Sequence, residues 1–334
     1  MSRTILITGG SGFIGSYILR SLAERGDTVI NFDNQPPRPE ATWWLKSVQE
    51  SITFVRGGID SWSSVSETVQ RYQPDGIIHL AAIGSPVVLK DRPDLALNVN
   101  IQGSFNILEA ARVMSVKRLV YFSSIGVLPG VCYEPIDTNH PVLLATEGPG
   151  ASFYGASKIA GEALCWAYHQ SFGLDFIVLR PSAVYGFGMF LPIYIKPMVE
   201  NSLRGLPTHF QYGREFPRDY THVEDVAQLA IKALDVPAAD VRDRIFYAAT
   251  GQPLVTSGQT AEIVKGLITG ADIEVGAGLS DDDLVEIRYR GILSIKNAQE
   301  QLGYQPRFTH LQDGIVNYIE VYKQYLSEHP ESGS

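Results

Sequence analysis

The sequence predicts an α/β fold in which a doubly wound parallel sheet is joined to a smaller C-terminal region. Short apolar runs alternate with helix-like segments over residues 1–180, which is typical of strand–helix–strand units. A glycine-rich turn directly follows the first apolar run. The alternation stops after Pro181, so we expect 1–180 to form one domain and 181–330 to form mainly a second region, with 218–250 returning to the first.

Apolar runs bounded by polar residues or glycine predict the buried parallel strands of this sheet. The clearest helices between them are expected over 100–115 and 156–172. Alternation of this kind implies right-handed crossovers, with helices on both faces of the sheet. The predicted strands are TILIT (4–8), DTVINF (27–32), ITFVRG (52–57), GIIHLAA (76–82), KRLVYFSS (117–124) and DFIVLRP (175–181).

The composition is that of an ordinary globular chain, with 334 residues, 45% hydrophobic and 19% charged. A formal net charge of −9 argues against a general nucleic-acid binder, which needs a basic face. Cys132 and Cys165 lack the spacing of a disulfide framework or a zinc site, which predicts no metal and a reducing, cytoplasmic location. No apolar segment approaches the length of a membrane span, so no membrane association is expected.

The stretch ITGGSGFIG follows the first predicted strand and can be read as Gly10-x-Gly12-x-x-Gly15 or as Gly9-x-x-Gly12-x-x-Gly15. Glycines at these spacings let the backbone turn tightly and approach a pyrophosphate, while the next helix directs its N-terminal amides at it. Asp33 follows Gly15 by 18 residues, at the end of the second strand. Together these features predict a Rossmann-like dinucleotide site rather than a glycine-rich turn with a capping aspartate.

The carboxylate of Asp33 also indicates which dinucleotide is bound. It can accept hydrogen bonds from the adenosine ribose hydroxyls and would repel a 2′-phosphate, which favours NAD over NADP. Arg38 lies close enough in the sequence to be the one feature that speaks for NADP.

The stretch SFYGASK places Tyr154 and Lys158 four positions apart, so both side chains lie on one face if the segment is helical. Taken alone, this spacing also fits an aromatic ring packed against a lysine stem. Ser123 and Ser124, however, end the predicted strand 117–124, at the edge where doubly wound proteins bind their ligands. Whether Tyr154 and Lys158 remove a proton from an alcohol or only pack together is therefore left open by these residues alone.

Several ordered motifs extend this pattern over nearly the whole chain. After the glycine loop come HLAA (79–82), NVNIQGSFNILEAA (98–111), SSIGV, YGASK, LRPSAVYG (179–186), RDYTHVEDVA (218–227) and LGYQP (302–306). Together they resemble the extended short-chain dehydrogenases/reductases, the NAD-dependent epimerase/dehydratase family. That resemblance implies a carbohydrate-like small-molecule substrate, and a homodimer formed by helices 100–115 and 156–172.

The resemblance also implies roles for individual residues. Tyr154 would be the general base, Lys158 would favour its phenolate and hold the nicotinamide ribose, and Ser124 would hydrogen-bond the reacting oxygen. The substrate would contact Ser123, Ser124 and Arg218. The cofactor would contact Gly9, Gly12, Phe13, Ile14, Gly15, Asp33, Ile59, Leu80, Ala81, Ala82, Asn98, Tyr154, Lys158 and Pro181.

Several residues depart from the family pattern and reduce the number of reactions that the chain is expected to catalyse. Ile125 and Gly126 replace the acidic pair of the dehydratases and cannot exchange protons, which argues against dehydration. Ala183 stands where nucleotide-sugar enzymes place an asparagine, although Arg218 suits a diphosphate unless it forms only an Arg–Asp surface pair. Gly58 replaces an aspartate near the adenine.

Three functions therefore stay open at this stage. The first is NAD-dependent epimerisation of a sugar or nucleotide sugar. The second is net dehydrogenation of a free sugar or small hydroxy compound, which Ala183 favours. The third is a non-catalytic dinucleotide sensor, which would have little use for Ser124, Tyr154 and Lys158 together.

Two further segments lie near the predicted pocket. The proline-punctuated loop 128–150, in which Leu128-Pro129-Gly130 replaces the family's Tyr-Gly, is expected to be a lid or a substrate wall. The apolar stretch 187–198 is either such a wall or core. His140 is either a group of the pocket or, as we expect, a surface histidine of the loop, and His222 is expected to be structural, at a helix start.

Overall fold

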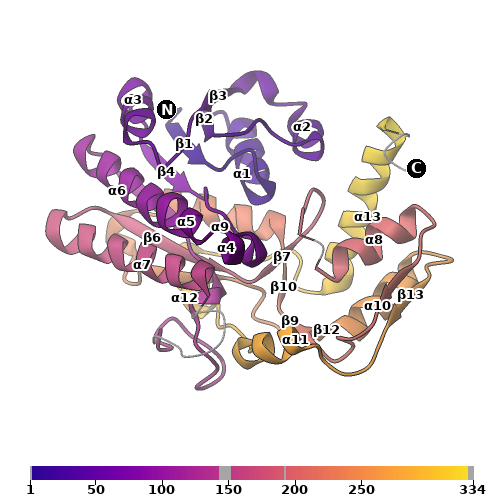
Figure 1. Cartoon of the computed structure of the whole chain (residues 1–334). Helices are drawn as coiled ribbons and strands as arrows, with labels where there is room; N and C mark the ends of the chain where they lie inside the picture. The colour runs from indigo at the N-terminus through magenta and orange to yellow at the C-terminus, as the bar shows by residue number, and fades with distance from the viewer. Residues whose placement is uncertain (1, 143–151, 192, 330–334) are drawn as a thin grey trace.

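The computed structural model describes residues 2–142, 152–191 and 193–329. Its centre is a seven-stranded, all-parallel sheet in the order β11-β6-β5-β4-β1-β2-β3, with helices on both faces (Figure 1). The predicted doubly wound α/β fold is confirmed. The strands are β1 (Thr4–Thr8), β2 (Thr28–Asp33), β3 (Ile52–Arg56), β4 (Gly76–His79), β5 (Arg118–Phe122), β6 (Phe176–Pro181) and β11 (Ile245–Ala248).

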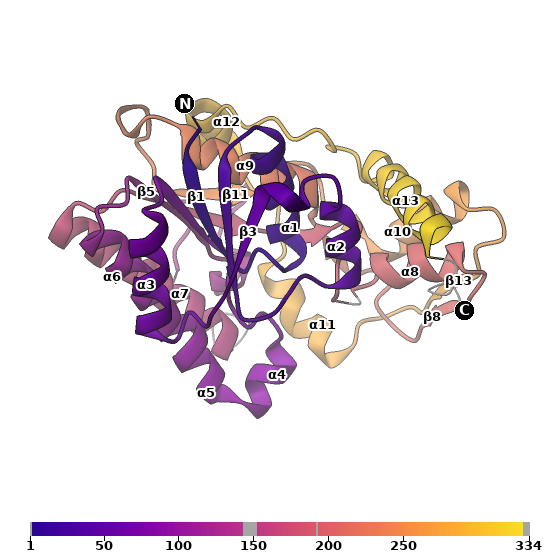
Figure 2. The same ribbon diagram turned by 90° about the horizontal axis from the view of Figure 1, so that it is seen from above.

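Alternating side chains of the strands bury into two separate cores, one on each face of the sheet. Ile5 and Ile7 of β1 face α1 (Phe13–Glu24) and α9 (Val223–Asp235), whereas Leu6 faces the opposite layer. That layer consists of α3 (Trp62–Tyr72), α6 (Gly103–Val113) and α7 (Phe153–Phe172) (Figure 2). Because all seven strands are parallel, their carboxyl ends lie at one common edge of the sheet.

The C-terminal region has a third core of its own, which includes Tyr185, Phe187, Met198, Val264 and Ile315. In Figure 2 the helices of this region lie together at one side of the sheet. They are α8 (Ile195–Leu203), α10 (Ser257–Leu267) and α13 (Leu311–Glu328), together with the parallel pair β8 (Thr208–Phe210) and β13 (Ile273–Val275).

Short strand pairs connect this region to the sheet domain. β7 (Ala183–Tyr185) runs parallel to β10 (Tyr220–His222), and β9 (Pro217–Arg218) runs antiparallel to β12 (Val255–Thr256). Within 218–250, α9 packs on the sheet and β11 pairs with β6. The remaining helices are α2 (Pro39–Leu45), α4 (Pro86–Asp91), α5 (Pro93–Leu95), α11 (Asp281–Glu286) and α12 (Lys296–Leu302), with 3₁₀ turns at Gln49–Ser51, Ile125–Val127, Ala238–Asp240 and Ile287–Tyr289.

Most predicted boundaries lie within three residues of the observed ones, and two differences matter for the site. The helix expected over 100–115 is a π-helical stretch, Ala96–Gln102, that continues into α6. The strand expected over 76–82 ends at His79, so Leu80 to Ala82 leave the sheet at its carboxyl edge. None of the described helices is both long and apolar enough to cross a membrane.

Candidate active site

The glycine loop brings backbone so close to backbone that side chains are excluded. Gly9 has φ +74°, and a Cβ atom there would lie 2.7 Å from the amide nitrogen of Ala81. A Cβ at Gly15 would overlap the carbonyl oxygen of Gly9, and Gly12 caps the first turn of α1. This cradle at a helix N-terminus fits a dinucleotide pyrophosphate, because the backbone amides and the helix dipole favour negative charge.

Asp33 ends β2 beside this loop. Its Oδ2 accepts a hydrogen bond from Ser11 N at 3.1 Å, and its Oδ1 accepts one from Gln35 N at 3.1 Å. Burial raises the pKa of the carboxyl group, and these amide donors oppose that shift. Arg38 caps α2, with its guanidinium 4.8 Å from the ring centroid of Phe190.

Ser124 and Tyr154 lie on either side of Gly126. Ser124 follows β5 and caps the 3₁₀ turn Ile125–Val127, where its Oγ accepts a hydrogen bond from Gly126 N at 3.0 Å. A Cβ on Gly126 would lie 3.3 Å from Ser124 Oγ and 3.6 Å from Tyr154 Cε1. A side chain at residue 126 would therefore crowd both groups.

Lys158 lies one turn after Tyr154 on α7, with its ammonium 5.8 Å from the centroid of the tyrosine ring. The side chain is buried, and its Nζ donates a hydrogen bond to Phe122 O at 2.7 Å. Burial lowers the pKa of Lys158 to about 8, and the negative charge of Glu162 opposes this shift. Burial also raises the pKa of Tyr154, against a hydrogen bond with Ser124. The protein alone therefore keeps Tyr154 as the phenol.

Ser123, which is expected to contact the substrate, is engaged with other protein groups in this structure. Its side chain is buried, and its hydroxyl donates to Glu162 Oε1 at 2.5 Å. Side chains alternate across a strand, so adjacent serines at its end face different surroundings. Ser124 remains beside Tyr154, whereas Ser123 is held by the buried pair of Glu162 and Arg180.

The other residues expected at the cofactor lie around the same edge, with one exception. Phe13 and Ile14 form the first turn of α1, Leu80 to Ala82 follow β4, and Pro181 ends β6. Ile59 is buried against Gly103. The exception is Asn98, which is exposed on the π-helical stretch.

Asn100, two residues after Asn98, is buried, and its side chain forms several hydrogen bonds. Its amide group accepts from Ile83 N at 2.8 Å, and it donates to Ile83 O at 3.1 Å and to Ser157 Oγ at 3.0 Å. It thereby connects the loop after β4 to α7, three residues from Tyr154. The motif NVNIQGS contains both asparagines, and only the helical register distinguishes them.

Arg218 is buried on β9 and does not form the surface Arg–Asp pair considered above. Its guanidinium carbon lies 4.3 Å from the ring centroid of Phe216 and 5.0 Å from that of Tyr194. Its Nη2 is 3.7 Å from Glu286 Oε2, and the same carboxylate oxygen lies 2.9 Å from Arg290 Nη2. The sequence analysis did not find Glu286 or Arg290, because they lie in an irregular segment with no periodic pattern.

This geometry agrees with comparisons to known proteins. Residues 5–249 match the model of the NAD dependent epimerase/dehydratase family. The chain belongs to this family. It is accordingly an NAD-dependent enzyme of the extended short-chain dehydrogenase/reductase type, as the motifs predicted.

Relatives of this family match the chain over almost its whole length. A putative UDP-glucose 4-epimerase of Methanocaldococcus jannaschii is 30% identical, covering 96% of this chain and 98% of the relative. The solved UDP-glucose 4-epimerase of Thermotoga maritima, with UDP-glucose, has a TM-score of 0.82 at 27% identity and covers 97% and 99% of the two chains. That of Thermus thermophilus, in complex with NAD, has a TM-score of 0.79 at 28% identity and covers 96% and 99%.

The prediction that His140 lies at the surface is wrong. His140 is buried; its Nε2 accepts from Cys132 N at 2.9 Å, and its Nδ1 lies 3.2 Å from Pro141 O. The imidazole thus holds the loop backbone on both sides. His222 is also buried, and it caps α9 by accepting a hydrogen bond from Glu224 N at 3.3 Å.

The structure describes only part of the two segments, 128–150 and 187–198, that are expected near the pocket. Phe187 and Met189 belong to the C-terminal core, whereas Phe190 and Leu191 are exposed. In the loop 128–150, the section up to residue 142 is described, and it is bound to the C-terminal region through Ile136. Residues 143–150 lie outside the described part of the chain, and so does the lid expected there.

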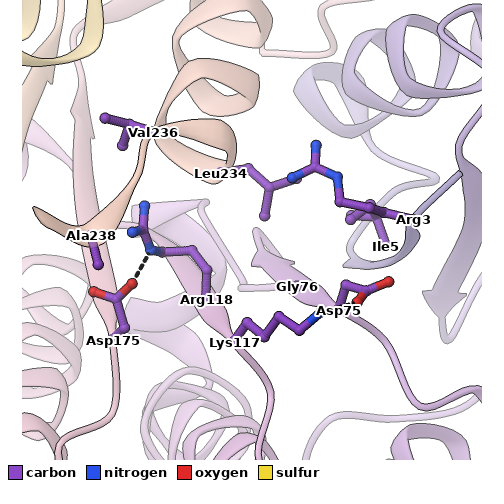
Figure 3. A pocket seen from close by; sticks show the side chains of 10 residues that line it. All are labelled: Arg3, Ile5, Asp75, Gly76, Lys117, Arg118, Asp175, Leu234, Val236 and Ala238. Carbon is purple, nitrogen blue, oxygen red and sulfur yellow. Dashed lines mark hydrogen bonds and ion pairs between the residues drawn. The ribbon is translucent and has the colours of Figure 1, made fainter. Parts of the chain in front are cut away.

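A cavity of about 250 Å³ lies away from this site, at the opposite edge of the sheet (Figure 3). Arg118 pairs there with Asp175, and Lys117 pairs with Asp75 at 2.7 Å. Its charges therefore neutralise one another in pairs. Doubly wound proteins bind their ligands at the carboxyl ends of the strands, whereas this cavity lies at the amino ends. It is therefore not the active site.

Proposed function

We propose that the protein epimerises a nucleotide sugar by oxidising one of its secondary alcohols and then reducing the resulting ketone from the other face. The observation that carries this proposal is the placement of Ser124 and Tyr154 around Gly126, with the Lys158 ammonium 5.8 Å from the tyrosine ring. NAD supplies a reversible acceptor for the two electrons of the carbinol C–H bond.

The chain's own residues perform the proton transfer. Tyr154 takes the proton from the substrate hydroxyl and returns it in the reverse step, while Ser124 hydrogen-bonds the same oxygen. The pKa of Tyr154 is raised by burial, so the phenolate requires positive charge nearby. Lys158 provides one such charge, and its hydrogen bond to Phe122 O holds it in place.

A diphosphate substrate is supported by the surroundings of Arg218. This guanidinium is buried, and its Nη1 has no hydrogen-bond partner among the described residues. Buried arginine donors without partners are costly, and a phosphate oxygen satisfies them with a charge-assisted bond. The relative from Thermotoga maritima was solved with UDP-glucose, which supports a uridine diphosphate sugar here.

Net dehydrogenation of a sugar without a nucleotide is the second candidate. Ala183 supports it, because its methyl group offers no polar anchor where nucleotide-sugar enzymes place an asparagine. Its backbone amide is already used by Asp219 O at 3.1 Å.

One variant tests the mechanism, and one measurement separates the two candidates. Tyr154→Phe is expected to lower turnover of UDP-glucose about 10²- to 10⁴-fold while the NAD content stays unchanged. Unchanged turnover would remove Tyr154 from the mechanism. Denaturing the purified protein should release nearly one NAD per chain if an epimerase retains its cofactor, whereas reversible NAD binding would favour the dehydrogenase.

We also propose that the protein is a cytoplasmic homodimer formed through α6 and α7. Each of these helices carries large apolar side chains that are exposed in the single chain, which is unusual unless another surface covers them. The location is proposed because neither cysteine is in a disulfide. Phe172→Asp should yield monomers in analytical ultracentrifugation, and an unchanged dimer would exclude this interface. The exposed side chains are Phe105, Val113, Phe153, Trp166 and Phe172.

A further inference from the structure

A single carboxylate oxygen lies between Arg218, which is proposed to bind the diphosphate, and the neighbouring Arg290. Glu286 Oε2 lies 2.9 Å from Arg290 Nη2 and 3.7 Å from Arg218 Nη2. The two arginines come from separate parts of the chain, β9 and the segment after α11. Glu286 ends α11 and is the one carboxylate that bridges them among the described residues.

The arginines are anchored independently of this carboxylate. Arg218 lies 4.3 Å from the ring centroid of Phe216, and Arg290 lies 4.8 Å from that of Tyr289. Stacking on aromatic faces fixes a guanidinium without using its in-plane donors. Both cations therefore have an aromatic contact that does not depend on Glu286.

Glu286 is the exposed partner of the three. Its side chain is 41% exposed, against 8% for Arg218 and 10% for Arg290. An exposed glutamate at a helix end can turn into solvent at little energetic cost, whereas the buried arginines cannot. Arg218 Nη1 and Arg290 Nε are buried and lack hydrogen-bond partners in the described part of the chain, so the carboxylate satisfies the site only in part.

We propose that Glu286 is an internal competitor of the substrate, which occupies the arginine site and is displaced when a nucleotide diphosphate binds. The inference rests on the proposed function, since it takes Arg218 as a diphosphate ligand. A diphosphate brings more negative charge and more acceptor oxygens than one carboxylate, so it can replace Glu286. A ligand with a single negative charge gains little over the carboxylate and is disfavoured.

The test is the affinity of the NAD-loaded protein for UDP, measured by isothermal titration calorimetry. Glu286→Gln removes the competing charge and should tighten UDP binding about three- to tenfold. Glu286→Ala should do the same, which shows that loss of the carboxylate is the cause. Asp281→Asn removes an exposed charge from the start of the same helix and should change the affinity less than twofold.

Weaker or unchanged UDP binding in both Glu286 variants would overturn the inference, because Glu286 would then support the arginines or be indifferent to the ligand. Arg218→Met separates this failure from a failure of the proposed function. If Arg218→Met loses UDP binding at least tenfold while the Glu286 variants match the wild type, the diphosphate site stands and only the inference is wrong. If neither the wild type nor any variant binds UDP, the nucleotide-sugar proposal fails and the inference fails with it.

Discussion

Glu162 holds Arg180 through both of its carboxylate oxygens, with Oε1 2.9 Å from Nε and Oε2 2.7 Å from Nη2. Both side chains are buried, and Ser123 adds a third hydrogen bond to Oε1. Glu162 lies one turn after Lys158 on α7, and Ser123 directly precedes Ser124. The ion pair holds α7 against β6, and the Ser123 hydrogen bond holds the end of β5, so Ser124, Tyr154 and Lys158 are fixed relative to one another.

We expect Glu162→Gln to destabilise the protein strongly. The variant leaves the Arg180 guanidinium buried opposite a neutral amide, and breaking a buried pair costs about 3–5 kcal/mol. Urea unfolding at pH 7 measures the loss. Glu109→Gln is the matched control, because Glu109 pairs with Arg112 on α6 with both side chains partly exposed. That change should cost at most about 1 kcal/mol, and equal losses would contradict the assignment.

Stability should depend on pH through Lys158. Its pKa is lowered to about 8 in the folded protein by burial, so between pH 8 and its ordinary value of 10.5 the unfolded chain binds more protons. Because of this residue, stability should rise with pH across that window, by about 3 kcal/mol in total. The burial penalty on the ammonium is fully present below pH 8.

Lys158→Met does not titrate, so the difference in unfolding free energy between wild type and variant isolates this effect. Urea unfolding at pH 7, 8, 9 and 10 should show the wild type gaining on Lys158→Met as the pH rises. Lys323→Met, at an exposed position on α13, controls for the loss of one positive charge. A difference that stays flat over this range would mean that Lys158 is not held in an apolar environment.

The sequence was sufficient where local backbone rules act. Short apolar runs bounded by polar residues or glycine predicted the sheet, and the glycine spacing predicted a close approach that Gly9 and Gly15 do make. Tyr154 and Lys158 share a helix face because one turn separates them. Each of these features leaves its signal in a few consecutive residues, even where the contact it makes, such as that of Gly9 with Ala81, is with a distant segment.

The sequence failed where a side chain's role depends on contacts between distant segments. Ser123 and Ser124 are adjacent, and only the presence of Glu162 on α7 decides that Ser123 is bound there while Ser124 lies beside Tyr154. His140 sits in a proline-rich loop that looks exposed, yet Cys132 N and Pro141 O enclose it. Neither the pairing of Arg218 with Glu286 nor the use of Asn100 leaves a periodic signal.

Asp33 should determine the choice of dinucleotide. Asp33→Ala is expected to weaken NAD binding about tenfold and NADP binding less, because only NAD loses a favourable ribose contact while NADP loses a repulsion. Asp33→Asn can still accept from Ser11 N, so it separates the effect of charge from any loosening of the glycine loop. Fluorescence titration with both dinucleotides measures the ratio. Equal losses for the two would undo the ribose argument.

Replacing glycine by alanine should impair NAD binding at residue 15 but stabilise the protein at residue 266. Gly15→Ala introduces a methyl group that overlaps the Gly9 carbonyl, so the loop must move and NAD affinity should fall at least tenfold. Gly266 lies in α10, and a Cβ there would meet nothing within 4 Å. Gly266→Ala should raise stability by about 0.5–1 kcal/mol and leave NAD binding unchanged, because alanine is the better helix former. Thermal unfolding and NAD titration of both variants check this, and a Gly15→Ala protein with normal NAD affinity would show that the pyrophosphate lies elsewhere.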